Sequence, residues 1–200
     1  MQRNRRLWAL GTVLTLTATL MLLTTLASPA GAQAQHVRWD IISVTGGTPA
    51  PGAQINPGGT ASAKAPDGDT ITLTGFGHFI APAGGGGSGA VDGGGTWTTT
   101  SGGSGTYTVT ALVSWQFANF QTEVGFIDNI DEGTKANGTA VLEIAFSDGS
   151  TGVLTVGCHG PGAPPGIFEG IATTKGFKTY YNVPAPVGGV DAGRTLFHVR

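Results

Sequence analysis

The chain of 200 residues contains a single cysteine, Cys158, and therefore cannot form a disulfide within itself. Core packing has to supply the stability that small exported proteins often draw from disulfides. A free cysteine behaves as a small hydrophobic residue, and a buried site is its more common environment. We therefore favour a buried and inert Cys158, with an exposed and reactive thiol as the alternative.

Charge is also scarce, because charged residues make up only 11% of the chain. Three of the ten basic residues lie within the first six positions, and the remaining seven are scattered. Without a basic patch, the chain lacks the electrostatic footprint of a nucleic-acid or anionic-lipid binder. The composition does not favour disorder either, since 40% of the residues are apolar. We expect no nucleic acid among its partners.

Metal-binding spacings are absent from the sequence. The four histidines are dispersed and form no H-x-H, H-E-x-x-H or C-x-x-C arrangement; they are His36, His78, His159 and His198. An acidic stretch at residues 128–133 suggests a calcium loop, but Ile130 and Thr139 occupy the third and twelfth positions, which an EF-hand reserves for its oxygen ligands. We expect no metal and no cofactor. A solvated turn is the preferred interpretation of the acidic stretch, and irregular calcium binding is the alternative.

The first 34 residues have the organisation of a secretory signal peptide. Three arginines precede an apolar run at residues 7–26, and small residues follow it. The A-x-A pattern occurs twice, so we expect cleavage after Ala32 or after Ala34. An uncleaved membrane anchor is the alternative, because the run is long enough to span a bilayer. Cleavage leaves a secreted, extracellular protein without membrane attachment, and both the general secretory and the twin-arginine pathway stay open.

Residues 35–200 have the pattern of a single all-β domain. Segments rich in β-branched and aromatic residues alternate with clusters of glycine, proline, asparagine and aspartate. We expect eight or nine strands, drawn from residues 37–44, 70–80, 95–100, 106–117, 139–146, 151–158, 167–173, 177–183 and 195–199. Short strands joined by hairpins predict an antiparallel β-sandwich or a small β-barrel, and the sequence does not choose between them. A glycine-rich loop is expected at residues 84–95, and one helical turn at residues 117–133 remains open.

Two segments carry the clearest strand signals. At residues 106–117, apolar side chains fall on alternate positions, which predicts one buried and one wetter face; these are Tyr107, Val109, Ala111, Val113, Trp115 and Phe117. Only Leu112 interrupts the polar side. Asp148 and Gly149 lie between two apolar runs, which predicts a hairpin with a type I′ turn.

A glycine- and proline-rich loop at residues 157–166 is the most distinctive segment. Proline restricts φ and glycine permits positive φ, so we expect the loop to be rigid and tightly bent. Rigid loops on a sheet often carry sites, although a structural crossover between two sheets explains the same composition. The candidate ligand-binding residues lie beside this loop or within predicted strands; they are His78, Cys158, His159, Glu169 and His198.

Catalysis by Cys158 requires a partner that its neighbours do not supply. Cys158 and His159 are adjacent on an extended chain, so their side chains point to opposite faces. A thiolate at Cys158 would need a base from elsewhere, such as His78 or His198. We therefore assign no catalytic residue.

Glu169 is the acidic residue with the most unusual predicted environment. It alternates with Ile167 and Ile171, which places it on an apolar face of a predicted strand. A carboxylate there is buried and paired, or it lines a polar cavity. Paired with a second carboxylate at the right separation, it would suit glycoside hydrolysis. Glu143, by contrast, alternates with apolar residues on both sides of it, so we expect its side chain to face solvent.

Three stretches resemble small secreted bacterial all-β proteins of uncharacterised function. They are residues 93–97, the loop at residues 157–170 and the segment 191–199. The resemblance implies an exported single domain. It implies no activity and assigns no functional residue.

The preferred hypothesis is a secreted, non-catalytic all-β module that binds a small molecule or a carbohydrate, with the loop at residues 158–169 at the rim of the site. A barrel enzyme, a hydrolase or isomerase that uses Glu169 with a histidine, is the first alternative. A structural or surface-interaction protein without a pocket is the second. The sequence leaves the oligomeric state open.

Overall fold

The computed structural model describes residues 34–46, 52–83, 85–122, 125–183 and 194–200. The fold described below is that of the compact unit Gln33–Arg200. The predicted signal peptide, apart from Ala34, lies outside the described residues.

The described residues form thirteen strands and no helix. The strands are β1 (Gln35–Thr45), β2 (Gln54–Pro57), β3 (Ala61–Lys64), β4 (Thr70–Leu73), β5 (Phe76–Ala81), β6 (Val91–Thr99), β7 (Ser104–Phe120), β8 (Ile127–Asp128), β9 (Thr134–Phe146), β10 (Thr151–Cys158), β11 (Gly170–Lys175), β12 (Lys178–Asn182) and β13 (Thr195–Val199). The all-β prediction is therefore confirmed, but the prediction of eight or nine strands was too low.

The additional strands come from segments that the sequence pattern did not resolve. Residues 45–66, where no strand is expected, contain β2 and β3, and the expected strand at residues 70–80 is divided into β4 and β5. Val91 begins β6, so the second half of the glycine-rich segment 84–95 is strand. Strands of only four residues, such as β2, β3 and β4, lack the length that makes alternation visible in a sequence.

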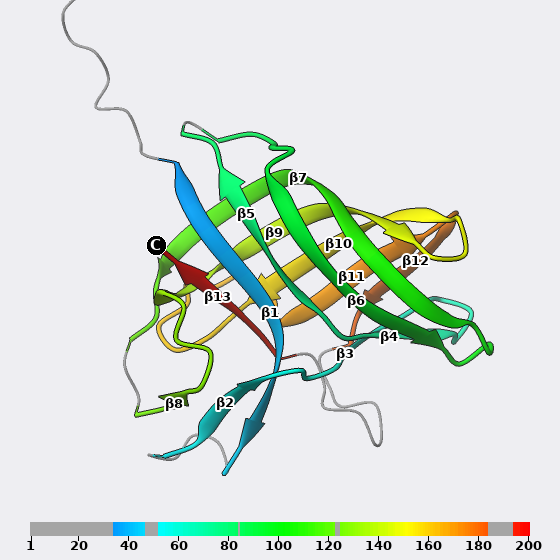
Figure 1. Cartoon of the computed structure of the whole chain (residues 1–200). Helices are drawn as coiled ribbons and strands as arrows, with labels where there is room; N and C mark the ends of the chain where they lie inside the picture. Colours follow the sequence, from blue (N-terminus) through cyan, green and yellow to red (C-terminus); the bar gives the residue numbers. More distant parts are fainter. Residues whose placement is uncertain (1–33, 47–51, 84, 123–124, 184–193) are drawn as a thin grey trace, which may run out of the picture. The chain divides into compact units, whose positions relative to one another are not determined.

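The strand pairings close into a ring (Figure 1). From β7 the ring continues through β9, β10, β11, β12, β3, β4 and β6, and β6 pairs with β7 again. At the start of β9, β13 replaces β10 as the neighbouring strand, and β5 replaces β4 beside the start of β6. β1 pairs with both β13 and β5, so this end of the ring is closed as well. These pairings are antiparallel, and β2 with β8 is parallel.

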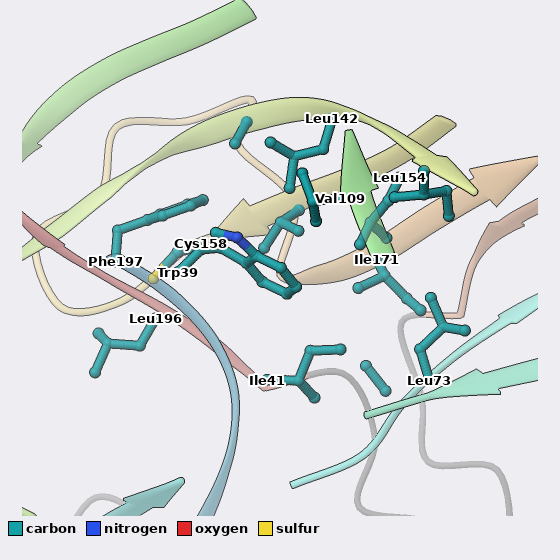
Figure 2. Close-up of a cluster of buried hydrophobic side chains, with 14 of the residues drawn as sticks. Trp39, Ile41, Leu73, Val109, Leu142, Leu154, Cys158, Ile171, Leu196 and Phe197 are labelled. Carbon is teal, nitrogen blue, oxygen red and sulfur yellow. The ribbon is translucent and has the colours of Figure 1, made fainter. Parts of the chain in front are cut away.

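The core lies on the inner side of this ring. Figure 2 shows side chains from β1, β7, β9, β10, β11 and β13 converging, among them Trp39, Leu142 and Phe197. Trp115 packs edge-on against Phe79 and Phe197, with ring centroids 5.6 and 4.6 Å apart. Large side chains from strands distant in sequence thus fill one apolar cluster.

The alternation predicted for residues 106–117 holds only in the first half of β7. Tyr107 and Val109 are buried, but Val113 is 43% exposed, whereas Leu112 is 2% and Trp115 8% exposed. The pairing of β7 with β9 shifts register between Val109 and Ala111 and again between Leu112 and Ser114. Each bulge adds a residue to one strand and exchanges the faces that follow. The prediction that Val113 and Trp115 share the buried face was therefore wrong.

The hairpin at residues 147–150 forms as predicted and joins β9 to β10. The predicted type I′ turn was wrong, however. Gly149 has a φ of 86°, whereas Asp148 is not among the residues with positive φ. The backbone N–H of Gly149 donates to Phe146 O at 3.0 Å, and Phe146 N donates to Ser150 O at 2.8 Å. This is a type I turn followed by a left-handed glycine, the common longer hairpin.

A segment that includes β8, residues 125–132 (called the strap below), crosses the side of β1 and β13 that faces away from the core. Side chains alternate along a strand, so His198 leaves β13 on the face opposite Phe197. Asp128 of the strap accepts a hydrogen bond from His198 Nε2 at 2.8 Å, and Glu132 pairs with Arg38. Covered on both faces, all five residues of β13 are buried. Within the described segments, no helix is long and apolar enough to cross a membrane.

Candidate functional site

Three of the five candidate residues meet at one pocket. Cys158 ends β10, His159 follows it, and Glu169 precedes β11, so the two ends of the Gly/Pro loop bring the three together. The pocket has a volume of about 260 Å³. His78 and His198 do not line it. We call this site the Glu169 pocket.

The walls of the Glu169 pocket are chiefly aliphatic. Ile42, Ile55 and Leu196 are each at most 4% exposed and form part of its lining. Val44 and Phe126 of the strap add to these walls. Figure 2 shows Leu196 and Phe197 leaving β13 on opposite sides, Phe197 toward the core. The apolar side of the pocket is therefore supplied by the outer faces of β1, β2 and β13.

Glu169 is held by two backbone N–H groups, one at the start of β13 and one just past the end of β10. Its Oε1 accepts from Thr195 N at 2.8 Å, and its Oε2 accepts from His159 N at 2.5 Å. Burial raises the pKa of Glu169 to about 7, although these N–H groups and the charges of Arg194 and His159 act in the opposite direction. Glu169 lies just before β11 and not inside a strand as predicted, because β11 begins only at Gly170.

Cys158 is buried, as favoured from the sequence, with 1% exposure. Gln121 Nε2 donates to its Sγ at 3.3 Å. Burial, and then the charge of Glu169, raise the pKa of the thiol well above its ordinary value. A protonated and covered thiol is a poor nucleophile.

His159 is exposed and does not pair with Cys158. Its Nδ1 lies 2.8 Å from the carbonyl oxygen of Ile167, which is an acceptor, so Nδ1 carries the proton. The ring therefore spans the base of the loop, and its remaining nitrogen, Nε2, is available to a ligand or to water.

Asn137 is a structural residue of the site that sequence reasoning missed. Its Oδ1 accepts from Gly160 N at 2.8 Å, and its Nδ2 donates to Asn119 Oδ1 at 3.0 Å and to Pro161 O at 3.3 Å. Asn137 followed by Gly138 is a local turn signal, and with Thr139 it matches a glycosylation sequon. They lie inside β9, where Asn137 is fully buried. A buried amide therefore fixes the Gly/Pro loop to the sheet.

His78 belongs to a separate cleft of about 560 Å³. Its Nδ1 lies 2.9 Å from Asp92 Oδ1, and its Nε2 lies 3.3 Å from Glu132 Oε2. Glu132 also pairs with Arg38, whose Nε and Nη2 each donate to the buried Asp40 at 2.8 Å. The polar groups along this cleft thus largely satisfy one another.

His198 is fully buried and lines neither site. Its Nε2 bonds to Asp128, while its Nδ1 has no hydrogen-bond partner. Burial raises the pKa of Asp128, but the bonds from His198 and the strap backbone outweigh it and leave that pKa lowered. Asp128 Oδ1 accepts from Ile130 N at 3.0 Å, so the acidic stretch is a turn here. Among the described residues, no group of three acidic, histidine or cysteine side chains is arranged to hold a metal ion.

No family model, no curated protein and no solved structure matches this chain.

Proposed function

We propose that the protein is an exported, non-catalytic module that binds a small molecule in the Glu169 pocket. The observation that carries the proposal is the placement of a titratable carboxylate against an aliphatic wall, in a pocket open to solvent. Small-molecule sites are characteristically apolar concavities with a few convergent polar groups. Gln121, His159, Glu169 and Arg194 are those groups.

The chemistry of the same residues argues against nucleophilic catalysis. Cys158 is covered and protonated, and His159 is engaged with the loop backbone. Among the described lining residues, Glu169 is the only carboxylate, so the second acid of a glycosidase pair is lacking there. Both oxygens of Glu169 already hold backbone N–H groups.

One observation supports an enzyme as the second candidate. A carboxyl group whose pKa lies at about 7 is suited to general acid–base catalysis at neutral pH. In such an enzyme, His159 is the histidine that acts together with Glu169. Turnover whose pH–rate profile bends near pH 7, and which disappears in Glu169→Gln, would favour this alternative over simple binding.

Two further proposals concern the whole chain. We infer that the ring of strands is a small closed β-barrel rather than a sandwich, because successive neighbours return to the starting strand. We also propose that residues 1–34 direct export and are removed. The expected mature protein then begins at Gln33 or Gln35.

Binding can be tested with N-phenyl-1-naphthylamine, an uncharged fluorescent probe that brightens in apolar surroundings. Val44→Trp places a bulky ring in the pocket, whereas Val113→Trp changes an exposed position of β7 that does not line it. We expect the wild type and Val113→Trp to bind the probe with the same affinity. Val44→Trp should bind it about tenfold more weakly, because the added ring takes up part of the pocket. A tenfold change in Kd corresponds to about 1.4 kcal/mol. Equal affinities in all three proteins would contradict a site at Glu169.

A further inference from the structure

The Glu169 pocket combines a chiefly aliphatic wall with a carboxylate that can accept more hydrogen bonds than it does in this structure. Each oxygen of Glu169 accepts one backbone N–H, and a carboxylate oxygen can accept two hydrogen bonds. The remaining lone pairs need water when the carboxylate is ionised. A ligand that fills the pocket against Ile42 and Leu196 displaces that water.

Few charged groups face Glu169. From the end of β10 these are His159 and the Cys158 thiol, and from the residue before β13 the guanidinium of Arg194. The described lining residues of β1, β2 and the strap are all apolar. Glu169, when ionised, and Arg194 carry opposite charges, so the pocket offers no net charge that would select a ligand head of either sign.

We propose that the Glu169 pocket takes an uncharged ligand with an aliphatic body and a hydroxyl or amide head, and that this ligand binds more tightly when Glu169 is protonated. The proposal rests on the proposed function and names its ligand class. The protonated carboxyl group can donate to a hydroxyl or carbonyl oxygen of the head, whereas the aliphatic body packs against Ile42, Leu196 and Phe126.

The sign of the pH dependence follows from linkage. Covering Glu169 with an uncharged ligand removes water from the ionised form and raises the pKa of this carboxyl group above its value of about 7 in the free protein. The complex then holds more protons than the free protein above pH 7, so affinity falls as the pH rises. If binding raises the pKa by one unit, the Kd rises about tenfold between pH 6 and pH 9.

Three probes with the same eight-carbon body test the ligand class: 1-octanol, octylammonium and octanoate. Isothermal titration of each, from pH 6 to pH 9, is expected to show tightest binding by 1-octanol and a Kd for it that rises about tenfold over this range. Glu169→Gln should flatten the profile. Glu143→Gln, an exposed position outside the pocket, should keep it.

Glu169→Gln can also disturb the backbone bonds to Thr195 and His159, so a second measurement uses the wild type alone. Carbon-13 NMR of the glutamate carboxyl groups should show one group titrating near pH 7 and moving upward when 1-octanol is added. A flat 1-octanol profile in the wild type, or tighter binding of either charged probe, would overturn the inference. If none of the three probes nor N-phenyl-1-naphthylamine binds at any pH, the proposed function itself fails.

Discussion

Asn137 and Glu169 are two of the polar side chains that attach the segment between β10 and β11 to the rest of the molecule. Asn137 binds Gly160 and Pro161 from β9, and Glu169 joins the end of β10 to the start of β13. Both are buried or nearly so, and each satisfies backbone groups that would otherwise lose water without a replacement. The rigidity of the pocket rim therefore depends on these two residues as well as on the prolines of the loop.

Asn137→Ala tests this attachment. The substitution leaves the Gly160 N–H and the Asn119 side chain without their partner, so we expect a loss of about 3 kcal/mol in the free energy of unfolding, measured by urea denaturation. Asn129→Ala is the matched control, because Asn129 donates to Asn56 Oδ1 at 2.7 Å on the exposed surface. It should cost less than about 1 kcal/mol. Equal losses would show that Asn137 does not anchor the loop.

Some of these residue environments could be predicted from sequence and some could not. Cys158 lies two and four residues after Val156 and Leu154, so the three side chains point to the same face of a regular strand. β10 is regular over its full length, and the burial of Cys158 follows from this alternation. Asn137 was missed because Asn followed by Gly is a local turn signal, whereas the pairing of β9 on both edges is decided by distant strands. The approach of Cys158, His159 and Glu169 was expected, since one short loop joins them.

At the scale of elements, the glycines of β6 allow it to lie unusually close to β5. Gly93 has a φ of 112° and is paired with Gly77. A Cβ on Gly93 would lie 2.4 Å from Phe76 O and 2.5 Å from Gly77 Cα. No side chain fits there without moving a strand. The stretch at residues 93–97, distinctive in the sequence, is thus explained by close backbone contact.

Gly93→Ala should destabilise the protein by about 3 kcal/mol, because strain from positive φ adds to the clash with β5. Gly149→Ala separates the two effects, since Gly149 has a φ of 86° but a Cβ there meets nothing within 4 Å. We expect it to cost about 1 kcal/mol. Thermal unfolding of both variants measures the difference. A Gly93→Ala variant no less stable than Gly149→Ala would argue against the tight β5–β6 contact.

The strands that sequence reasoning located best are those joined by a short turn or made of an uninterrupted apolar run. β10 and β13 have the predicted bounds. β7 was located, but its faces were assigned wrongly beyond Val109, since bulges depend on the partner strand and have no signature in the strand's own alternation. β2, β3 and β8 are too short to show a period.

At the scale of the whole molecule, the ring brings together segments that are far apart in the chain. β12 pairs with β3, and β1 with β13, so strands near the two ends of the domain complete the circuit. Which of these distant strands pair is decided by how side chains pack across the whole molecule, and a local sequence pattern does not show it. The sequence therefore predicted the all-β class but not the order of strands. The Glu169 pocket lies on the outer side of β1 and β13, where the strap and the Gly/Pro loop border it.

The most direct test of this account is an NMR titration of the wild-type protein with 1-octanol, with backbone amide shifts followed for the whole domain. The Glu169 pocket and the His78 cleft share no lining residue, so the perturbed amides show which one is used. We predict saturable shifts at Cys158, His159, Thr195 and Leu196, and none at His36 or Asp92. Shifts confined to the His78 cleft, or no saturable shift at all, would contradict the assignment of the Glu169 pocket as the binding site.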